Sequence, residues 1–294
     1  MMRMKEAYQV LQQRLQSMYE PREASQIAEM VMEKISGYSR TERLIHHEKL
    51  LNADQTEIFE EDLKELEGGR PVQYVLGECW FQDMVFKVDE RVLIPRPETE
   101  ELVEYIKSSY KNIPCSVDNP CRLIDIGTGS GCIAVSLKKA LPLFEVWAVD
   151  KSLKALELAK ENAKILDVKI SFKQSDILEE SKNDSLPAFN VIVSNPPYIP
   201  LNESKELEKH VIAFEPNEAL FVTNQDPLEF YKAIVEFAEH HLLRGGMIFF
   251  ETHEKYARGV VQLLEENEFE QIQIKKDLQG KDRIVSGKRM GASL

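Results

Sequence analysis

The segment from Leu123 to Asp150 constrains the fold most strongly. It opens with the apolar run Leu123-Ile124-Asp125-Ile126, passes through a glycine-rich turn that ends at Gly131, and continues with an apolar helical pattern. A second apolar run, Phe144 to Val149, then ends at Asp150. Strand, glycine turn, helix and strand in this order are typical of the first half of a nucleotide-binding α/β domain with a parallel sheet.

The glycine turn reads Gly127-Thr128-Gly129-Ser130-Gly131. Glycines tolerate positive φ and let the backbone approach a ligand, and free N–H groups at the start of a helix attract its negative end. With Asp125 and Asp150 at the ends of the two strands, the turn predicts a cofactor site in which the Asp150 carboxylate accepts both ribose hydroxyls. A dinucleotide dehydrogenase shares such an acid. The spacing here is G-x-G-x-G, however, and no chemistry for a nicotinamide follows, so the pattern favours S-adenosylmethionine.

A second motif, Asn195-Pro196-Pro197-Tyr198, directly follows the apolar run Phe189 to Ser194. It is therefore expected at the carboxyl end of a strand, where open α/β sheets bind ligands. The Asn195 side-chain oxygen and the Pro196 carbonyl can accept both hydrogens of a planar NH₂ group, while Tyr198 stacks on it. This arrangement favours methyl transfer to an amide or exocyclic amino nitrogen. A simple proline-rich turn is the alternative, and the strand before the motif and the glycine turn upstream argue against it.

Asp176 follows a third predicted strand, Lys169 to Gln174. At the end of that strand its carboxylate would lie beside the adenine of the cofactor and accept the amino hydrogens. A helix N-cap explains an aspartate at this position equally well, and both interpretations stay open.

Several further segments match one family. With the two motifs above, the chain resembles the HemK-type protein-(glutamine-N5) methyltransferases, which modify the glutamine of the Gly-Gly-Gln motif in peptide chain release factors. Pro95-Arg96-Pro97-Glu98-Thr99-Glu100 is the most family-specific segment, whereas Asn-Pro-Pro-Tyr is shared with DNA and RNA amino-methyltransferases. The matching segments cover most of the chain: Pro71-Val72-Gln73-Tyr74 with Gly77, Val92 to Glu100, Asp125 to Gly131, Asn195 to Ile199, and Glu215-Pro216 with Ala219-Leu220.

The resemblance implies that Asn195, Pro196 and Tyr198 act on the glutamine amide and that the Glu98-Thr99-Glu100 segment lines the cofactor side of the cleft. The chain departs from the family at two places. A Gly-rich stretch is replaced by residues 223–227, and Ile177, which we still expect to contact the cofactor, stands where an aromatic residue is frequent. An aromatic stack on adenine is therefore not expected at that position.

The expected architecture has three parts: a helical bundle over residues 1–71 that recognises the protein substrate, a β-hairpin linker over 72–95, and a class I S-adenosylmethionine-dependent methyltransferase domain over 96–294. In the first part, apolar residues recur at helical spacing. Its balanced charge is compatible with docking of a partner, but a solvated neutral face explains it equally well. Met30 and Met32 are expected in its core. Capping boxes are predicted at Ser39 with Glu42 and at Asp54 with Glu57, and Gly68-Gly69 should end the last helix.

The remaining elements complete a seven-stranded Rossmann-like α/β sheet. Gln82-Asp83 predicts a two-residue hairpin turn between two short strands. A helix with buried Leu102, Val103 and Ile106 should begin after the prolines. The last elements, in order, are a helix from Leu228 to Leu243, a turn at Arg244-Gly245-Gly246, a strand from Met247 to Glu251, a helix from Lys255, and an antiparallel pair at Ile272–Ile274 and Ile284–Val285 joined near Gly280.

The charge of the chain limits its partners. Lys and Arg number 37 against 50 Asp and Glu, a formal net charge of −13. Such acidity disfavours contact with a phosphate backbone, which needs clustered Lys and Arg, so we expect a protein partner and no direct nucleic-acid binding. No apolar run approaches membrane-spanning length and the amino terminus lacks a signal-peptide core, so we expect a cytoplasmic protein without membrane contact.

Metal binding and disulfides are not expected. The adjacent pairs His46-His47 and His240-His241 would point to different faces of a helix, which does not suit a metal site. The cysteines lack CxxC or zinc-site spacing and should all be reduced; they are Cys79, Cys115, Cys121 and Cys132.

Two other functions remain open. A DNA or RNA amino-methyltransferase would use the same Asn195 loop, with a flipped base stacked on Tyr198, although the charge argues against it. A non-enzymatic protein that binds the cofactor as a scaffold or sensor is less favoured, because the acceptor loop is intact.

Overall fold

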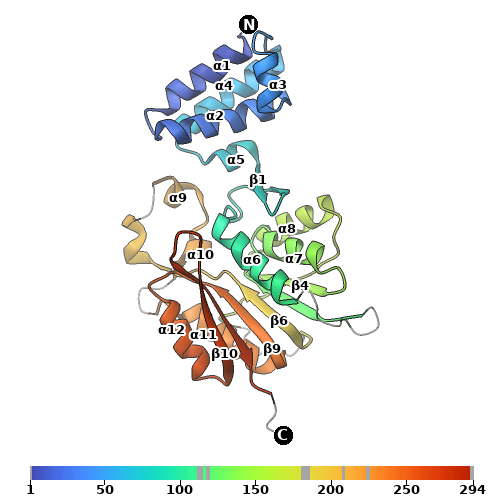
Figure 1. Cartoon of the computed structure of the whole chain (residues 1–294). Coiled ribbons are helices and arrows are strands. Elements are labelled where there is room, and N and C mark those ends of the chain that lie inside the picture. Colours follow the sequence, from blue (N-terminus) through green and yellow to red (C-terminus); the bar gives the residue numbers. More distant parts are fainter. Residues whose placement is uncertain are drawn as a thin grey trace. The chain divides into compact units, whose positions relative to one another are not determined.

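The computed structural model describes residues 2–110, 115–116, 120–179, 186–206, 209–222 and 226–291. The chain divides into two compact units, one of Met1–Glu78 with Lys209–Phe214 and one of Cys79–Glu208 with Glu215–Leu294 (Figure 1). The departure expected at residues 223–227 falls mostly outside the described residues, since 223–225 are not covered.

The first unit is helical and has its own core. Buried apolar side chains such as Leu11, Val31, Met32 and Phe59 form one cluster, against which Met30 packs, so the predicted core role of the two methionines is confirmed. Its helices are α1 (Met4–Leu15), α2 (Pro21–Ser36), α3 (Arg40–Ile45), α4 (Ala53–Glu67), α5 (Val72–Leu76) and α9 (Lys209–Phe214).

Two capping predictions have different outcomes. Ser39 and Glu42 form the expected capping box at α3. At α4 the prediction was wrong by two residues, because Asn52 and Gln55 form the box: Gln55 N–H donates to Asn52 Oδ1 at 2.8 Å, and Asn52 N–H donates to Gln55 Oε1 at 3.1 Å. Both residue pairs fit the pattern, and the extended backbone at Asn52 selects the earlier one.

The predicted hairpin is present as β1 (Glu78–Phe81) and β2 (Met84–Lys87). Gln82 and Asp83 have φ values of 50° and 57°, as a two-residue turn with two positive φ angles requires. Phe81 and Phe86 of the hairpin are buried in the core of the second unit, with ring centroids 6.0 Å apart. The hairpin is therefore anchored by its aromatic side chains as well as by its turn.

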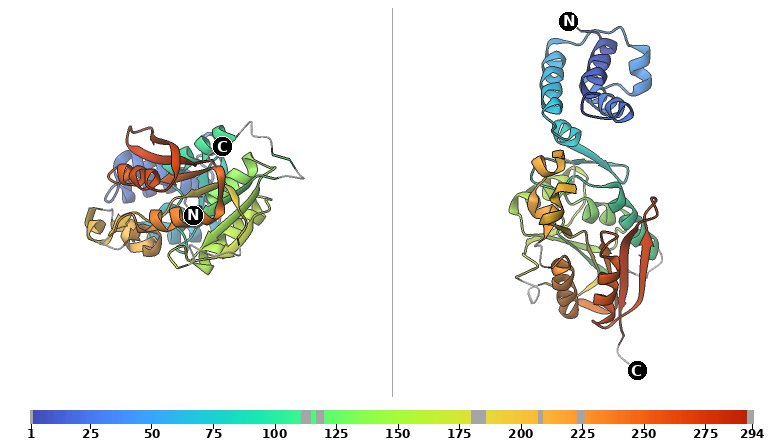
Figure 2. Two further views of the ribbon diagram at one scale, coloured as in Figure 1. Left: turned by 90° about the horizontal axis from the view of Figure 1, so that it is seen from below. Right: turned by 90° about the vertical axis from the view of Figure 1, so that its left-hand side faces the viewer.

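The second unit is built on the predicted seven-stranded sheet, in the order β10-β11-β9-β6-β3-β4-β5 over the described residues. β11 runs antiparallel to both its neighbours, and β9, β6, β3, β4 and β5 pair in parallel. The long final strands, β10 and β11, pair side by side, as the right-hand view of Figure 2 shows. The strand bounds are β3 (Arg122–Ile126), β4 (Glu145–Asp150), β5 (Ser171–Gln174), β6 (Phe189–Ser194), β9 (Leu242–Glu251), β10 (Phe269–Lys276) and β11 (Asp282–Arg289).

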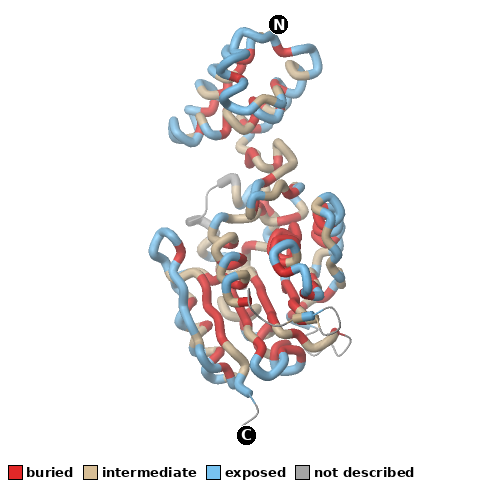
Figure 3. The backbone as a smooth tube through the Cα atoms, turned by 45° about the vertical axis from the view of Figure 1, so that its right-hand side comes forward, coloured by how far each residue is buried: buried red, intermediate tan, exposed pale blue. Residues whose placement is uncertain are grey.

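Helices cover both faces of this sheet. One core cluster joins α6 and α7 to side chains such as Val191 and Phe249, and another joins α11 and α12 to Ile192 and Phe250, the neighbours of these residues in sequence. Figure 3 accordingly shows the central strands as buried. The helix bounds are α6 (Pro97–Tyr110), α7 (Cys132–Ala140), α8 (Leu153–Ile165), α10 (Asn217–Leu220), α11 (Glu229–His241) and α12 (Ala257–Glu265); β7 (Ile199–Pro200), β8 (Phe221–Val222) and a 3-10 helix (Leu201–Glu206) are shorter.

The turn expected at Arg244-Gly245-Gly246 was wrong. β9 already begins at Leu242, and the two glycines accommodate a shift of register between β6 and β9. Gly245 has a φ of 79°, and a Cβ on Gly246 would lie 2.9 Å from the Asn190 carbonyl oxygen. Paired glycines indicated a change of direction, but here they permit an irregular strand in close contact with its neighbour.

The expectation of four reduced cysteines was also wrong. Cys115 and Cys121 form a disulfide with a Cα–Cα distance of 5.5 Å, whereas Cys79 and Cys132 are free and buried. The two cysteines are six residues apart in the sequence, and the fold places them at a distance that a disulfide can bridge. Patterns such as CxxC or zinc-site spacing do not cover a pair with this separation. Across the described ranges, no helix is both long enough and apolar enough to cross a membrane.

Candidate active site

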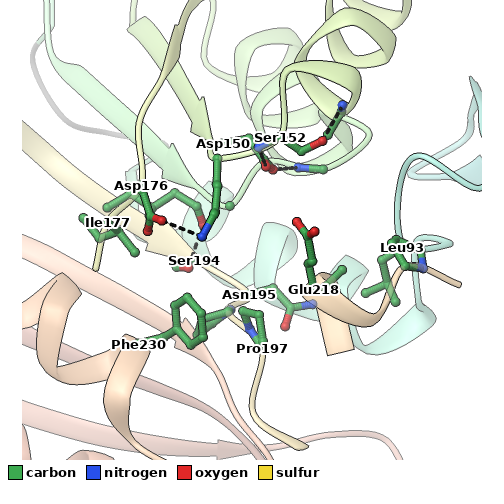
Figure 4. Close-up of a pocket in the computed structure, with 18 of the residues that line it drawn as sticks. Leu93, Asp150, Ser152, Asp176, Ile177, Ser194, Asn195, Pro197, Glu218 and Phe230 are labelled. Carbon is green, nitrogen blue, oxygen red and sulfur yellow. Dashed lines mark hydrogen bonds and ion pairs between the residues drawn. The ribbon is translucent and has the colours of Figure 1, made fainter. Parts of the chain in front are cut away.

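A cavity of about 460 Å³ lies at the carboxyl ends of the central strands, within the usual size range for small-molecule sites. Its walls include the residues that directly follow β3, β4, β5 and β6, so it occupies the ligand position of an open α/β sheet. Figure 4 shows Asp150, Asp176, Asn195 and Phe230 around this space. The predicted site residues that line it are Gly127, Gly129, Asp150, Asp176, Ile177, Asn195, Pro196 and Pro197.

The glycine turn has two distinct sides. Gly127 and Gly129 line the cavity with φ values of 74° and 53°, so their backbone is exposed to a ligand without an intervening Cβ. Gly131 has a φ of 81° and is the N-cap residue of α7, and a Cβ there would lie 3.2 Å from the Cβ of Ala159. Gly131 therefore serves the packing of α7 on α8, and it does not line the cavity.

Asp125, Thr128 and Ser130 also lie behind the cavity wall. Asp125 is fully buried, and its Oδ2 accepts a hydrogen bond of 2.6 Å from the Thr128 hydroxyl. Burial raises the pKa of Asp125 to about 7. The Ser130 carbonyl accepts a bond from Asn162, a buried residue of α8 that also bonds both backbone groups of Lys87 in the hairpin. These residues hold the shape of the glycine turn.

Asp150 faces the cavity and is held by two backbone groups. Its Oδ2 accepts from Gly129 N–H and its Oδ1 from Ser152 N–H, both at 2.9 Å. Burial raises the pKa of Asp150. Because a carboxylate oxygen has two lone pairs, each oxygen keeps one for a ligand hydroxyl, as the ribose prediction requires.

Asp176 lines the cavity, and the three residues after it, the last described before the gap at 180–185, form a turn. Its Oδ1 accepts from Leu178 N–H at 3.1 Å, and its Oδ2 forms an ion pair of 2.7 Å with Lys151, visible in Figure 4. Ile177 is buried and contributes an apolar wall. Phe230 of α11 supplies an aromatic ring to the same cavity, a feature that sequence reasoning missed because nothing in that helix marks it apart from other apolar positions.

The Asn-Pro-Pro-Tyr loop divides between cavity and core. Asn195, Pro196 and Pro197 line the cavity, whereas Tyr198 does not. Tyr198 packs against the core cluster under α11, with its ring centroid 6.0 Å from that of His253, and burial raises its pKa. The structure therefore separates Tyr198 from the three residues with which the sequence groups it.

Thr99 and Glu251 support Asn195 from behind. The Asn195 Nδ2 group donates to Thr99 Oγ1 at 3.2 Å, and the Thr99 hydroxyl donates to Glu251 Oε2 at 2.7 Å. Thr99 and Glu251 are both buried. Burial raises the pKa of Glu251 to about 7. Of the Glu98-Thr99-Glu100 segment, expected on the cofactor side of the cleft, none lines this cavity, and Glu100 instead accepts from Gln82 N–H in the hairpin.

Glu215 joins two segments that are far apart in sequence. Its side chain is 1% exposed, accepts from Ile94 N–H at 3.2 Å and pairs with Arg96 at 2.5 Å. The cavity is lined by a neighbour in sequence of each partner: Leu93 precedes Ile94, and Glu218 follows Glu215 by three residues. The Glu218 carboxylate extends toward its centre in Figure 4. Two of the matched segments thus form one wall of the site, a link that no local pattern reveals.

The cavity brings the glycine turn and Asp150 together with the loop at Asn195. Backbone N–H groups, a bidentate carboxylate and apolar walls suit an adenosine cofactor, and the Asn195 loop borders the same space. Within the described ranges, no cluster of three or more His, Cys, Asp or Glu residues could hold a metal ion.

Comparisons with known proteins place the chain among methyltransferases by sequence. Residues 111–218 match the family model described as "Methyltransferase small domain", and residues 6–77 match the one described as "PrmC N-terminal domain". Among solved structures, the ribosomal protein L11 methylase from Lactobacillus delbrueckii subsp. bulgaricus is 21% identical with a TM-score of 0.47, covering 68% of this chain and 82% of that one.

Curated relatives are more similar. A release factor glutamine methyltransferase of Flavobacterium psychrophilum is 40% identical, over 93% of this chain and 94% of the relative. One of Bacteroides thetaiotaomicron is 36% identical, over 95% of this chain and 98% of the relative. The similarity thus spans both units.

Proposed function

The chain belongs to the family of release factor glutamine methyltransferases, and on this premise we propose that it methylates the side-chain amide nitrogen (N5) of the glutamine in the Gly-Gly-Gln motif of peptide chain release factors, using S-adenosylmethionine. The observation that carries the proposal is the shared cavity: the acceptor loop at Asn195 borders the same space as Asp150 and the glycine turn. Methyl donor and amide can therefore meet at one place.

The cavity residues fit the cofactor. Gly127 and Gly129 present bare backbone to the nucleoside, Asp150 offers one lone pair on each oxygen to the ribose hydroxyls, and Asp176 with Ile177 borders the adenine position. Asp125, Thr128, Ser130 and Gly131 hold the turn in shape from behind. When bound, S-adenosylmethionine supplies an activated methyl group on a sulfonium.

Asn195 and Pro196 are the proposed catalytic acceptors. An amide nitrogen is a weak nucleophile, and two fixed acceptors that bind both its hydrogens turn the nitrogen toward the methyl donor. Transfer of the methyl group would leave a neutral thioether as the leaving group, and the nitrogen would lose one of its hydrogens as a proton to water. As the nitrogen gains positive charge its hydrogens become more acidic, so the same acceptors stabilise the transition state, and no strong base is required. Pro197 keeps the loop rigid. Tyr198, partly buried beside His253, is proposed to hold the loop and to reach the amide from its edge.

The division of labour follows the expected parts of the chain. We propose that residues 1–71 recognise the release factor, that 72–95 link the parts and that 96–294 carry out methyl transfer. The match of residues 6–77 to a family-specific domain model supports a dedicated role for the first part. The net charge of −13 favours a protein substrate over nucleic acid, and we place the reaction in the cytoplasm, without metal or membrane contact.

Mass spectrometry tests the function directly. The purified chain, incubated with S-adenosylmethionine and a release factor, should add one methyl group to the peptide that contains Gly-Gly-Gln. A release factor with glutamate in place of that glutamine should stay unmodified, because a carboxylate has no N–H groups for the acceptors. Methylation of RNA or DNA in preference to the release factor would contradict the proposal and favour the amino-methyltransferase alternative.

A further inference from the structure

We propose that Thr99 and Glu251 are positioning residues that fix the polarity of the Asn195 amide, so that its oxygen and not its nitrogen faces the substrate. The inference rests on the proposed function, in which the Asn195 oxygen is the acceptor. It assigns a task to the most family-specific segment, which otherwise has no contact with the cavity.

The contacts form a short chain from core to cavity. Thr99 lies in the first turn of α6, Glu251 is the last residue of β9, and Asn195 directly follows the neighbouring strand β6. Thr99 Oγ1 is 2.7 Å from Glu251 Oε2 and 3.2 Å from Asn195 Nδ2. Asn195 lines the cavity, and no hydrogen bond from a donor among the described residues is found to its Oδ1 atom, so this oxygen is available to a ligand.

The direction of these bonds follows from proton counting. An ionised carboxylate only accepts hydrogen bonds, and a threonine hydroxyl has a single proton to donate. Once that proton goes to Glu251, the Thr99 oxygen can only accept, so the group it contacts on residue 195 must be the NH₂. An asparagine side chain whose nitrogen is held in the core presents its oxygen outward.

Burial protects the hydrogen bonds of Thr99 and Glu251 from water. Thr99 is 2% exposed and Glu251 is also 2% exposed, so water does not compete for their hydrogen bonds. Charged groups act on Glu251 from each side: Arg283 of β11 and the nearby Arg96 lower its pKa, and Glu98 raises it. Tyr231 of α11 donates to the Glu251 backbone carbonyl at 3.1 Å and fixes the strand end.

Protonation of Glu251 would allow the Asn195 amide to turn over. A neutral carboxyl can itself donate to Thr99, which frees the hydroxyl proton to bond the Asn195 oxygen, and the amide can then turn its NH₂ toward the substrate. Because burial raises the pKa of Glu251 to about 7, this change falls in the neutral range. Turnover that depends on the ionised form should therefore decline as the pH falls through that value.

Substitutions separate positioning from packing. Thr99→Val keeps the shape but removes the hydroxyl, and it should lower kcat roughly tenfold or more with cofactor Kd changed by less than about threefold. Thr99→Ser restores the hydroxyl and should recover most of the turnover. Ser136→Ala, which removes a buried hydroxyl elsewhere in the fold, should leave kcat unchanged and serves as the matched control.

Two further measurements show whether Thr99 acts through Asn195. In an Asn195→Ala background, Thr99→Val should have almost no further effect on kcat, because the amide it orients is gone. Glu251→Gln should lower kcat and remove the decline of wild-type turnover between about pH 8 and pH 6, since the neutral amide does not titrate.

The outcomes are distinguishable from failure of the proposed function itself. A wild-type chain that does not methylate the release factor overturns the function. A wild-type chain that methylates normally, with Thr99→Val at full turnover or with fully multiplicative effects of Thr99→Val and Asn195→Ala, overturns the positioning role alone. If Thr99→Val does not fold, as judged by lost cofactor binding, the comparison of pH profiles for wild type and Glu251→Gln decides.

Discussion

Replacing Asp150 by alanine should weaken cofactor binding strongly and also cost some stability. In the proposed complex, the side chain accepts two hydrogen bonds from ribose hydroxyls. Hydrogen bonds to a charged group contribute roughly 1.5–3 kcal/mol each. Loss of two such bonds is therefore worth about 3–6 kcal/mol, or roughly a hundredfold to ten-thousandfold in Kd.

The structure adds a cost that the sequence did not suggest. Asp150 also accepts from Gly129 N–H and Ser152 N–H, and both donors lose their partner in the variant. Since they border the cavity, water can replace the carboxylate in part, so the free energy of unfolding should fall by about 1–3 kcal/mol without loss of the fold.

Calorimetric titration with S-adenosylmethionine measures the first effect, and urea denaturation of the cofactor-free protein measures the second. Glu218→Gln is the matched control, because it removes another cavity-facing carboxylate that is exposed to solvent. Its effect on Kd should stay within about fivefold. Unchanged affinity in Asp150→Ala would refute the ribose contact. Equal losses of cofactor affinity in both variants would mean that the cofactor responds only to the overall negative potential of the cavity.

Three other predictions follow from the site. Asn195→Ala should lower methylation of the release factor by about two orders of magnitude, with little change in cofactor affinity; normal turnover in a single-turnover assay would rule out the acceptor role. Deletion of residues 1–71 should preserve cofactor binding but greatly raise KM for the intact release factor, and an unchanged KM would exclude substrate recognition by this part. Burial raises the pKa of Asp125 to about 7, so the folded state binds this proton more tightly than the unfolded chain. The contribution of this proton to the free energy of unfolding is therefore complete at low pH and is lost as the pH rises from about 4 through 7. Asp125→Asn should flatten the decline in the free energy of unfolding, measured by urea titration, over this range.

Local signals in the sequence identified most of the elements. β6 coincides with the predicted run Phe189 to Ser194, and the hairpin turn falls at Gln82-Asp83 as expected. Both are determined by neighbours in the chain: apolar residues that must be buried in the first case, and a turn flanked by alternating strands in the second. Some segments fit two local structures equally well, and there the sequence pattern predicted the wrong one. This happened for the capping box of α4 and for the glycines of β9, which were expected to form a turn.

The cavity was predicted in part. Strand-end residues such as Asp150 and Asn195 line it because every parallel strand of the sheet delivers its carboxyl end to the same edge. The same argument grouped Tyr198 with these residues, whereas Tyr198 packs against the core cluster beside His253 and does not line the cavity. It could not detect Phe230, whose helix position looks like any other apolar one.

The sequence by itself determined the order of strands and helices, the glycine turn and the acceptor loop, because these depend on residues within a few positions of one another. Only the tertiary structure decided which distant residues meet. Arg96 pairs with Glu215 across more than a hundred residues. Thr99 of α6 links Asn195, which follows β6, to Glu251 of β9. Such contacts depend on the order of strands in the sheet and on burial that excludes water, and neither leaves a trace in local spacing.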